Sequence, residues 1–495
     1  MNDSSESTRS RFVPWAVIVV LAAGVWAFII VSGVLSRDLD GGIFLSTTAG
    51  IHQGLPLYSG VWDNKDPLFY GVMTVFSSAA PVLGFVMDWF WIALAAAGTA
   101  LIARRVVSLP TSLLLGCVAA PFLIVGPAYQ AGMTNTPGTA VALLSLGLLM
   151  NRWYLAAGIG MGLLLFLKIT VFPVMVLCAL VLLVFPTLRR GLLRVGVGLL
   201  ATVVVVVGLM AALGWLPGYL TMLQRNRNYA GDVIVYFGFA DSLFGHLERF
   251  GQEWAGTLWL AGVTAAVILI AGLGSLGLRH FHVQAEQALT VIWLVIGAIG
   301  IGLALSMTYV WPHHAQALSF VAVLAVIVLA QMLEQLPWPI LSWALILLAT
   351  FLLSGWSSPS QVVDRYQARL AALPGALSAV NEVSKDARLL NTVPASNFAY
   401  MRLGSNDDGG FLGSVRPGAV LACPEFHAYD FSPAETFARL YECLGTVDVV
   451  LKADSFDVFG NGGKAGNVRP LLDYVKSAFN CLVVEDRQLC TRKGF

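Results

Sequence analysis

Long apolar segments recur through the first 356 residues of this chain, and they restrict its fold more than any other feature. A helix of about 20 apolar residues is long enough to cross the hydrocarbon core of a bilayer. The mean hydropathy of the whole chain is +0.77, which is far above that of a soluble protein. We therefore predict an α-helical polytopic membrane protein with about 11 spans. The spans lie near residues 14–35, 84–103, 110–128, 133–150, 153–167, 170–186, 193–214, 254–277, 287–307, 315–333 and 338–356.

The first segment, Pro14 to Leu35, is longer than the apolar region of a signal peptide and precedes no clear cleavage site, so we expect it to remain as a span. One further apolar piece, about Leu68 to Leu83, could either span the membrane or lie in its interface. Seven arginines in the loops decide between these interpretations. If the piece lies in the external interface, all of these arginines fall on the cytoplasmic side together with Arg9 and Arg11. If it spans, all of them fall outside. They are Arg104, Arg105, Arg152, Arg189, Arg190, Arg194 and Arg279.

We therefore predict an interfacial piece, a cytoplasmic N-terminus, an extracytoplasmic C-terminus and a location in the plasma (inner) membrane. Residues 1–356 form the membrane domain, with external loops at 36–83 and 215–253. Residues 357–495 alternate helix-like and strand-like pieces, which predicts a small extracytoplasmic α/β domain. The expected helices lie at 364–383 and 471–479, and the expected strands at 419–422, 447–451 and 481–484.

The polar tail carries four cysteines, Cys423, Cys443, Cys481 and Cys490. An even set in a domain outside the cytoplasm predicts disulfides. We expect the pairs Cys423–Cys443 and Cys481–Cys490, because the other pairings cross the domain. A zinc site is the alternative, although no Cys-x-x-Cys pair occurs in the tail.

Charged residues concentrate in one stretch of the first external loop, Arg37 to Tyr70. The stretch holds Asp38, Asp40, Asp63, Lys65 and Asp66 in a chain of which only 12% of residues are charged. Charge beside a membrane is costly unless water, a partner or a function retains it. A plain solvated loop would have the same composition, so composition alone leaves both interpretations open.

The order of residues in this stretch resembles the first external loop of GT-C glycosyltransferases. The similarity is greatest to the bacterial branch related to protein O-mannosyltransferases and the lipid A aminoarabinose transferase. That branch carries an Asp-x-Gly-x-Phe stretch, a Gly-x-x-Tyr turn and an Asp-x-Lys-x-Pro stretch at similar spacing. Residues 40–44, 54–58 and 63–67 correspond to them in the same order, with one more residue between Gly54 and Tyr58 than in the family's turn.

Three more polar places fall on the outer side in the predicted topology. They are Lys168 to Thr170 at a turn between spans, Asn226 to Tyr229 in the large loop, and the turn Pro312-His313-His314. Each also has an ordinary interpretation: a lysine that reaches to the interface, a solvated interfacial helix, and a turn in the aromatic belt. The same branch has a Lys-Thr element, an Asn-x-x-Tyr run and a Pro-His-Tyr turn at these places, with His here in place of Tyr.

The resemblance implies transfer of a sugar from a polyprenyl-phosphate donor to a cell-envelope glycan, lipid or protein on the outer face, with inversion. The catalytic base that it implies is Asp40. Such a reaction also needs cations for the departing phosphate, and the candidates are Lys65, Lys168, Arg225 and Arg227. The remaining candidates for the substrate pocket are Asp38, Asp63, Asn226, Tyr229, His313 and His314.

One departure from the family's pattern concerns a metal ion. Many relatives have a second acidic residue near the position of Asn135 and Thr136, but no Asp or Glu occurs between Asp88 and Asp232. Hard divalent cations prefer several oxygen ligands, carboxylates among them. Metal-dependent catalysis is therefore doubtful, although Asp38 and Asp63 could supply a weak site.

Two other functions stay open at the level of the sequence. A carrier or flippase for a polyprenyl-linked glycan would also need a basic cavity, but it predicts ionisable residues near mid-span and related halves, and neither is evident. A catalytically inactive relative that scaffolds envelope enzymes would explain the missing acid. A nucleic-acid partner is not expected, because the net charge is only +1.

Overall fold

The structure is a computed structural model of the whole chain. The residues that it describes are 4–35, 44, 47–48, 50–52, 54–59, 61, 63, 65–78, 83–126, 129, 132–183, 189–224, 226, 318–334, 336–354, 389–391, 438, 441–442, 444–453, 469–484 and 487–494. They fall into two compact units. Unit 1 comprises residues 1–34, 88–206 and 233–362, and unit 2 comprises residues 35–87, 207–232 and 363–495.

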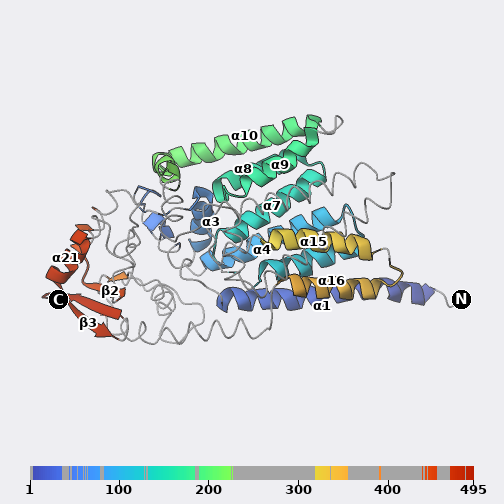
Figure 1. The fold of residues 1–495 in the computed structure, drawn as a ribbon, viewed down its shortest axis with the longest axis horizontal. Coiled ribbons are helices and arrows are strands. Elements are labelled where there is room, and N and C mark those ends of the chain that lie inside the picture. Colours follow the sequence, from blue (N-terminus) through green and yellow to red (C-terminus); the bar gives the residue numbers. More distant parts are fainter. Residues whose placement is uncertain are drawn as a thin grey trace, which may run out of the picture. The chain divides into compact units, whose positions relative to one another are not determined.

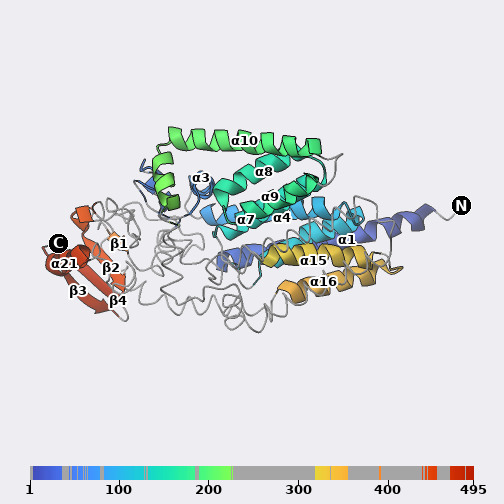
Figure 2. The same ribbon diagram turned by 45° about the horizontal axis from the view of Figure 1, so that its top comes forward.

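Unit 1 is helical in its described part. Figures 1 and 2 both show α7 beside α8, and α15 beside α16, with their axes nearly parallel. The helices are α1 (Ser4–Leu35), α4 (Leu83–Ala103), α5 (Leu109–Leu114), α6 (Ala120–Ile124), α7 (Asn135–Met150), α8 (Tyr154–Leu167), α9 (Phe172–Leu180), α10 (Arg189–Ala212), α15 (Leu318–Leu333) and α16 (Pro339–Ser354). A π-helical turn, Leu115–Ala119, joins α5 to α6, and a 3₁₀ turn, Val181–Leu183, follows α9.

Small residues let these helices pack closely. A Cβ atom at Gly98 of α4 would run into the backbone of Leu143 and Leu144 on α7, and one at Gly147 of α7 would lie 2.7 Å from the carbonyl oxygen of Gly98. Close backbone contact of this kind is the usual way in which helices associate in a membrane, where lipid is as apolar as leucine. The pattern fits the predicted environment.

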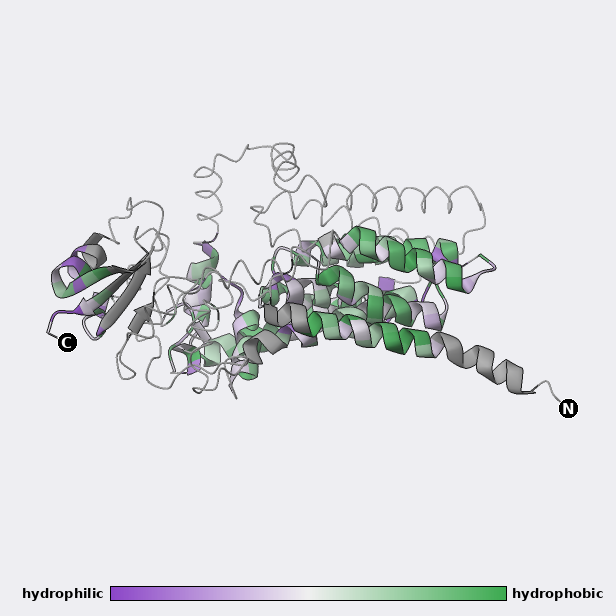
Figure 3. Ribbon diagram, turned by 90° about the horizontal axis from the view of Figure 1, so that it is seen from below, coloured by the Kyte–Doolittle hydropathy of each residue, from purple (hydrophilic) through white to green (hydrophobic). Residues whose placement is uncertain are grey.

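Large apolar side chains remain exposed on the described helices, and Figure 3 shows by colour that these helices are hydrophobic along much of their length. Leu193 on α10 is 73% exposed, and Ile340 on α16 is 81% exposed. An apolar exterior of this extent marks a surface that meets lipid or another protein rather than water. Among the described residues, α10 alone is long and apolar enough to cross a membrane by itself, and eight apolar helices are shorter.

Unit 2 contains residues 36–83, which are predicted to form the first external loop, and the polar tail. Helix α3 (Pro67–Ser77) begins directly after Asp66, with Pro67 in its first turn, a position where the missing N–H of proline costs nothing. Its 11 residues extend for only about 16 Å, roughly half of the hydrocarbon core. The location of this piece in the external interface stays a prediction. A second helix of the unit runs over residues 216–224.

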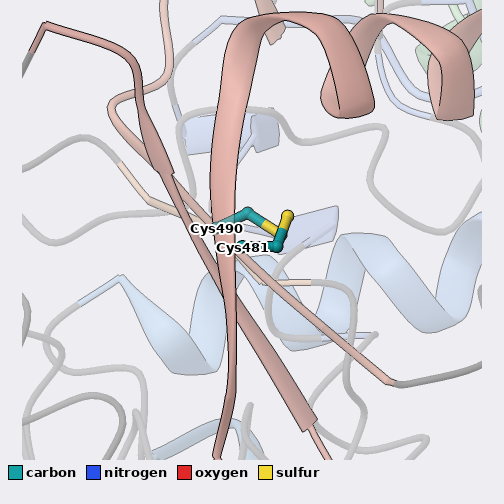
Figure 4. The surroundings of a disulfide bond; sticks show 2 residues. All are labelled: Cys481 and Cys490. Atoms are coloured by element: carbon teal, nitrogen blue, oxygen red, sulfur yellow. A yellow bond between two sulfur atoms is a disulfide. The ribbon is translucent and has the colours of Figure 1, made fainter.

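The tail forms a mixed four-stranded sheet. Its strands are β1 (Leu389–Asn391), β2 (Val449–Ala453), β3 (Phe479–Val484) and β4 (Arg487–Arg492), in the order β1-β2-β4-β3. β1 is parallel to β2, whereas β4 is antiparallel to both β2 and β3. Helix α21 (Arg469–Ala478) precedes β3. In the β3–β4 hairpin, Cys481 is paired directly with Cys490, and the two form a disulfide (Figure 4).

The expected elements that fall on described residues agree closely with the helices of unit 1 and with β2, α21 and β3 of unit 2. Helix α1 begins at Ser4, ten residues before the predicted span. Strands β1 and β4 were not expected, because β4 reads Arg-Gln-Leu-Cys-Thr-Arg and lacks an apolar run. The spans at 254–277 and 287–307, the helix at 364–383 and the strand at 419–422 lie outside the described residues. The count of 11 spans and the domain boundary at 356 stay predictions.

Candidate functional site

Lys65 is held from both ends in the first external loop. Its backbone N–H donates a 2.8 Å hydrogen bond to Oδ1 of Asp63, whose side chain is only 2% exposed. Its ammonium nitrogen lies 5.6 Å from the centre of the Phe44 ring, within the range of a cation–π interaction. The cation is therefore fixed at its backbone and supported along its side chain, rather than free to move as on a solvated loop.

Tyr58 joins the second stretch of the motif to the third. Its hydroxyl donates a 2.7 Å hydrogen bond to the carbonyl oxygen of Lys65. The residue is buried and its φ angle is +72°, a left-handed conformation that costs a bulky residue free energy. Burial, and after it the negative charges of Asp66 and Asp63, raise the pKa of Tyr58 well above its ordinary value, so the hydroxyl remains a donor.

Tyr58 also contacts the beginning of the large external loop. Its ring lies 5.8 Å, centre to centre, from the ring of Tyr219 on the helix over 216–224. Gly218 on that helix fits closely against Tyr58, because a Cβ atom there would lie 2.7 Å from the Cβ atom of Tyr58. Asn226 is also helical, and its side-chain amide donates to Sδ of Met222. All of these residues belong to unit 2, which thus brings Asp63, Lys65 and the helix before Asn226 into one arrangement.

Lys168 lies in unit 1, at the turn between α8 and α9. Its ammonium nitrogen donates a 3.2 Å hydrogen bond to Oγ1 of Thr134, the residue directly before α7. The stem of Lys168 packs on the first turn of α7, where a Cβ atom added to Gly138 would lie 2.9 Å from its Cβ and Cγ atoms. A lysine beside a helix N-terminus adds positive charge to the positive end of the helix dipole, and the two together favour an anion.

A buried acid that was absent from the predicted site holds the loop before α7. Oδ2 of Asp88, on α4, accepts hydrogen bonds from the Tyr129 hydroxyl at 2.9 Å and from the Gly132 N–H at 2.8 Å. This is the loop in which the sequence lacks the second acid that the resemblance led us to expect. The signal that could have found it is the presence of an ionisable residue inside an apolar span, which is rare without a role.

Several predicted residues lie outside the described part of the chain, and their roles stay predictions. They are Asp38, Asp40, Arg225, Arg227, Tyr229, His313 and His314, together with the pair Cys423–Cys443. The disulfide Cys481–Cys490 is confirmed. Within the described ranges, no group of three or more His, Cys, Asp or Glu side chains could hold a metal ion.

The chain has the GT-C fold, the architecture of a class of membrane glycosyltransferases. The chain is similar to ArnT, the lipid A aminoarabinose transferase, from Cupriavidus metallidurans, with 14% sequence identity. For ArnT in the apo state the TM-score is 0.52, with 96% of this chain and 97% of ArnT covered. For ArnT bound to undecaprenyl phosphate it is 0.56, with 96% and 98% covered.

The oligosaccharyltransferase AglB from Archaeoglobus fulgidus, in complex with an inhibitory peptide and a dolichol-phosphate, matches at a TM-score of 0.45 and 13% identity. The match covers 95% of this chain and 73% of AglB. No family model matches the sequence, and no curated protein does. The match to ArnT confirms the expected resemblance to GT-C glycosyltransferases at the level of the fold.

Proposed function

We propose that this protein is an inverting glycosyltransferase that moves one sugar from a polyprenyl-phosphate donor to a cell-envelope acceptor on the outer face of the membrane. The observation that carries the proposal is the ordered arrangement of the first external loop in a chain with the GT-C fold. Phe44, Tyr58, Asp63 and Lys65 come from three separate stretches of the sequence and contact one another in pairs. In a plain solvated loop we would expect the lysine to extend into water without these contacts.

The fixed cations suit a departing phosphate. A lipid-borne phosphate lies at the level of the headgroups, where external turns such as those of Lys65 and Lys168 are expected. The hydrogen bond from Lys168 to Thr134 places its ammonium beside the N-terminus of α7. Charges arranged in advance stabilise a leaving group without reorganisation as the bond breaks. We assign the donor phosphate to Lys65 and Lys168, with Arg225 and Arg227 as further ligands.

Asp40 is the proposed general base. In the reaction, the oxygen of the acceptor hydroxyl attacks the anomeric carbon from the side opposite the phosphate. The bond from that carbon to the phosphate oxygen breaks, and the hydroxyl proton moves to the carboxylate of Asp40. The products are a glycoside of inverted configuration and polyprenyl phosphate. Asp38, Asp63, Asn226, Tyr229, His313 and His314 are proposed to line the pocket, and no step requires a metal ion.

The proposed partner is a polyprenyl-phosphate lipid. One of the similar solved structures, ArnT, is bound to such a lipid, undecaprenyl phosphate. The proposed orientation places the N-terminus in the cytoplasm and the tail outside, in the plasma (inner) membrane. The Cys481–Cys490 disulfide supports an external tail, because disulfides persist in oxidising compartments.

The test uses the purified full chain in proteoliposomes with radiolabelled polyprenyl-phosphate sugars, one each for mannose, arabinose, galactose and an aminosugar. Transfer of the label to a cell-envelope extract, or its slow release by water, supports the proposal. Movement of intact labelled lipid across the bilayer without release would identify a flippase instead. Neither transfer nor movement with any donor would identify a catalytically inactive relative.

A further inference from the structure

The carboxyl of Asp88 holds the loop before α7 through a single oxygen atom. Oδ2 accepts both hydrogen bonds, from the Tyr129 hydroxyl and from the Gly132 N–H. Oδ1 is equally buried and accepts no hydrogen bond from any residue that the structure describes. The side chain as a whole is 0% exposed. Buried polar groups usually have a hydrogen-bond partner. The described partners of this carboxyl are the two groups that donate to Oδ2, so its structural role is to hold them.

The same loop holds Lys168 at its other end. Thr134, two residues after Gly132, accepts the hydrogen bond from the Lys168 ammonium. Gly132 has a φ of +83°, and the carbonyl of Thr134 accepts a 3.2 Å hydrogen bond from the Gly138 N–H, which begins the α7 ladder. Only Met133 separates Gly132 from Thr134, and consecutive Cα atoms are about 3.8 Å apart, so a shift at one end of this turn carries the other end with it. The position of Thr134 therefore depends on where Gly132 is held.

We propose that Asp88 is a positioning residue for Lys168. It fixes Gly132 and Tyr129, these fix Thr134 at the N-terminus of α7, and Thr134 fixes the ammonium of Lys168. The inference rests on the proposed function for the ligand of Lys168, which is the phosphate of the lipid-linked donor. It adds to that function a buried acid that never touches the substrate but sets where the cation meets it.

The arrangement requires an acceptor oxygen at Oδ2 rather than a negative charge. Asp88→Asn keeps an oxygen that can accept both hydrogen bonds. Its amide nitrogen takes the place of Oδ1, the buried oxygen that accepts no hydrogen bond from a described residue. Asp88→Ala removes the acceptor altogether. Tyr129→Phe removes one of the two donors and no bulk, so it decides the question even if Asp88→Ala fails to fold. Thr99→Val is a matched control, because Thr99 is buried on α4 and its hydroxyl has no described partner.

The first measurement reports on Lys168 itself and requires no turnover. The intact full chain in detergent is treated with an amine-reactive reagent, and modification of Lys168 is followed by mass spectrometry. Asp88→Asn and Thr99→Val should react like wild type. Asp88→Ala should react about five-fold faster, and Tyr129→Phe by a smaller factor, because loss of the hydrogen bonds frees the turn. Unchanged reactivity in whichever of Asp88→Ala and Tyr129→Phe folds, or an Asp88→Asn variant that behaves like Asp88→Ala, would overturn the inference.

The second measurement separates positioning from general loss of structure. The Kd for undecaprenyl phosphate is measured for Asp88→Ala, Lys168→Ala and the double variant. If Asp88 acts through Lys168, the double variant should bind no worse than Lys168→Ala alone. Additive losses would show that Asp88 acts on its own. A wild type that fails to bind undecaprenyl phosphate would refute the proposed function, whereas the labelling experiment still decides the positioning role.

Discussion

The backbone amide of Lys65 donates a hydrogen bond to the side chain of Asp63, two residues earlier, over 2.8 Å. The turn that this bond closes leaves the Lys65 ammonium beside the ring of Phe44, from a different stretch of the loop. The buried carboxylate of Asp63 thus helps to set the position of Lys65.

Lys65→Met keeps most of the apolar stem against Phe44 and removes the charge. If the ammonium binds the donor phosphate, KM for the donor should rise and kcat should fall, because the phosphate gains charge as it leaves. The loss in kcat/KM should be on the order of 100-fold, as for one charge-assisted contact in a desolvated site. Lys65→Arg is the matched control and should recover part of the loss, since it keeps the charge but not the shape. Steady-state kinetics with wild-type kcat/KM in Lys65→Met would contradict the assignment.

Asp40→Asn separates the base from the phosphate ligands. The change keeps shape and hydrogen bonding but removes the basic carboxylate, so kcat should fall by roughly 100-fold or more while the donor Kd stays near wild type. Asp38→Asn is the control, because a residue two positions away that is not the base should matter much less. An inactive Asp38→Asn beside an active Asp40→Asn would mean that the wrong carboxylate is named. Activity in both would rule out either as the base.

Gly138→Ala should weaken donor binding through Lys168. A Cβ atom at this position would lie 2.9 Å from the Cβ and Cγ atoms of Lys168, so the lysine stem or the α7 backbone must move. We expect the donor Kd to rise about ten-fold, the effect of a charged contact displaced by a few tenths of an ångström to an ångström. Gly196→Ala is the matched control, because nothing lies within 4 Å of its added Cβ atom on α10. Equal donor Kd values for the two variants would exclude the displacement.

Glu334 caps the N-terminus of α5 from a distant part of the sequence. Both of its carboxylate oxygens lie 2.9 Å from the Ser108 N–H, and Oε1 accepts a 2.8 Å hydrogen bond from the Thr111 hydroxyl. Glu334→Ala should lower the free energy of unfolding by about 1 kcal/mol, the typical value of a lost cap. Glu334→Gln keeps one acceptor oxygen and should lose less. Thermal unfolding in detergent measures both, and no fall in Tm for Glu334→Ala would contradict the capping role.

Alkaline pH should destabilise the first external loop through Tyr58. Burial raises its pKa in the folded state above the ordinary value of 10.0. Below about pH 10 the hydroxyl is protonated in both states and contributes no pH dependence. Above that value the unfolded chain loses the proton first, so the stability falls as pH rises. Phenolate absorbance of Tyr58 should therefore appear only as the protein unfolds, and a Tyr58→Phe difference spectrum isolates it. Ionisation at an ordinary pKa in the folded protein would contradict its burial.

The candidate site shows how far the sequence alone could be taken. The motif of the first loop pointed to Asp63 and Lys65, and the structure joins them by a hydrogen bond. It also shows why Tyr58 is in the motif, since its hydroxyl holds the carbonyl of Lys65. Asp88 was noted in the sequence as the last acid before a long gap, but nothing in its local pattern showed which loop it would reach.

The positions of the helices were determined by the sequence, because a chain in lipid must satisfy its backbone hydrogen bonds within each apolar segment. That requirement is local, so α4, α7, α8 and α10 fall where the apolar runs predict. The contact of Asp88 with Gly132 joins residues 44 positions apart, and that of Lys168 with Thr134 joins residues 34 positions apart. Such contacts depend on which helix faces pack together, which small residues such as Gly98 and Gly138 decide in three dimensions. Only the tertiary structure could therefore assign the buried acid and the lysine to the same turn.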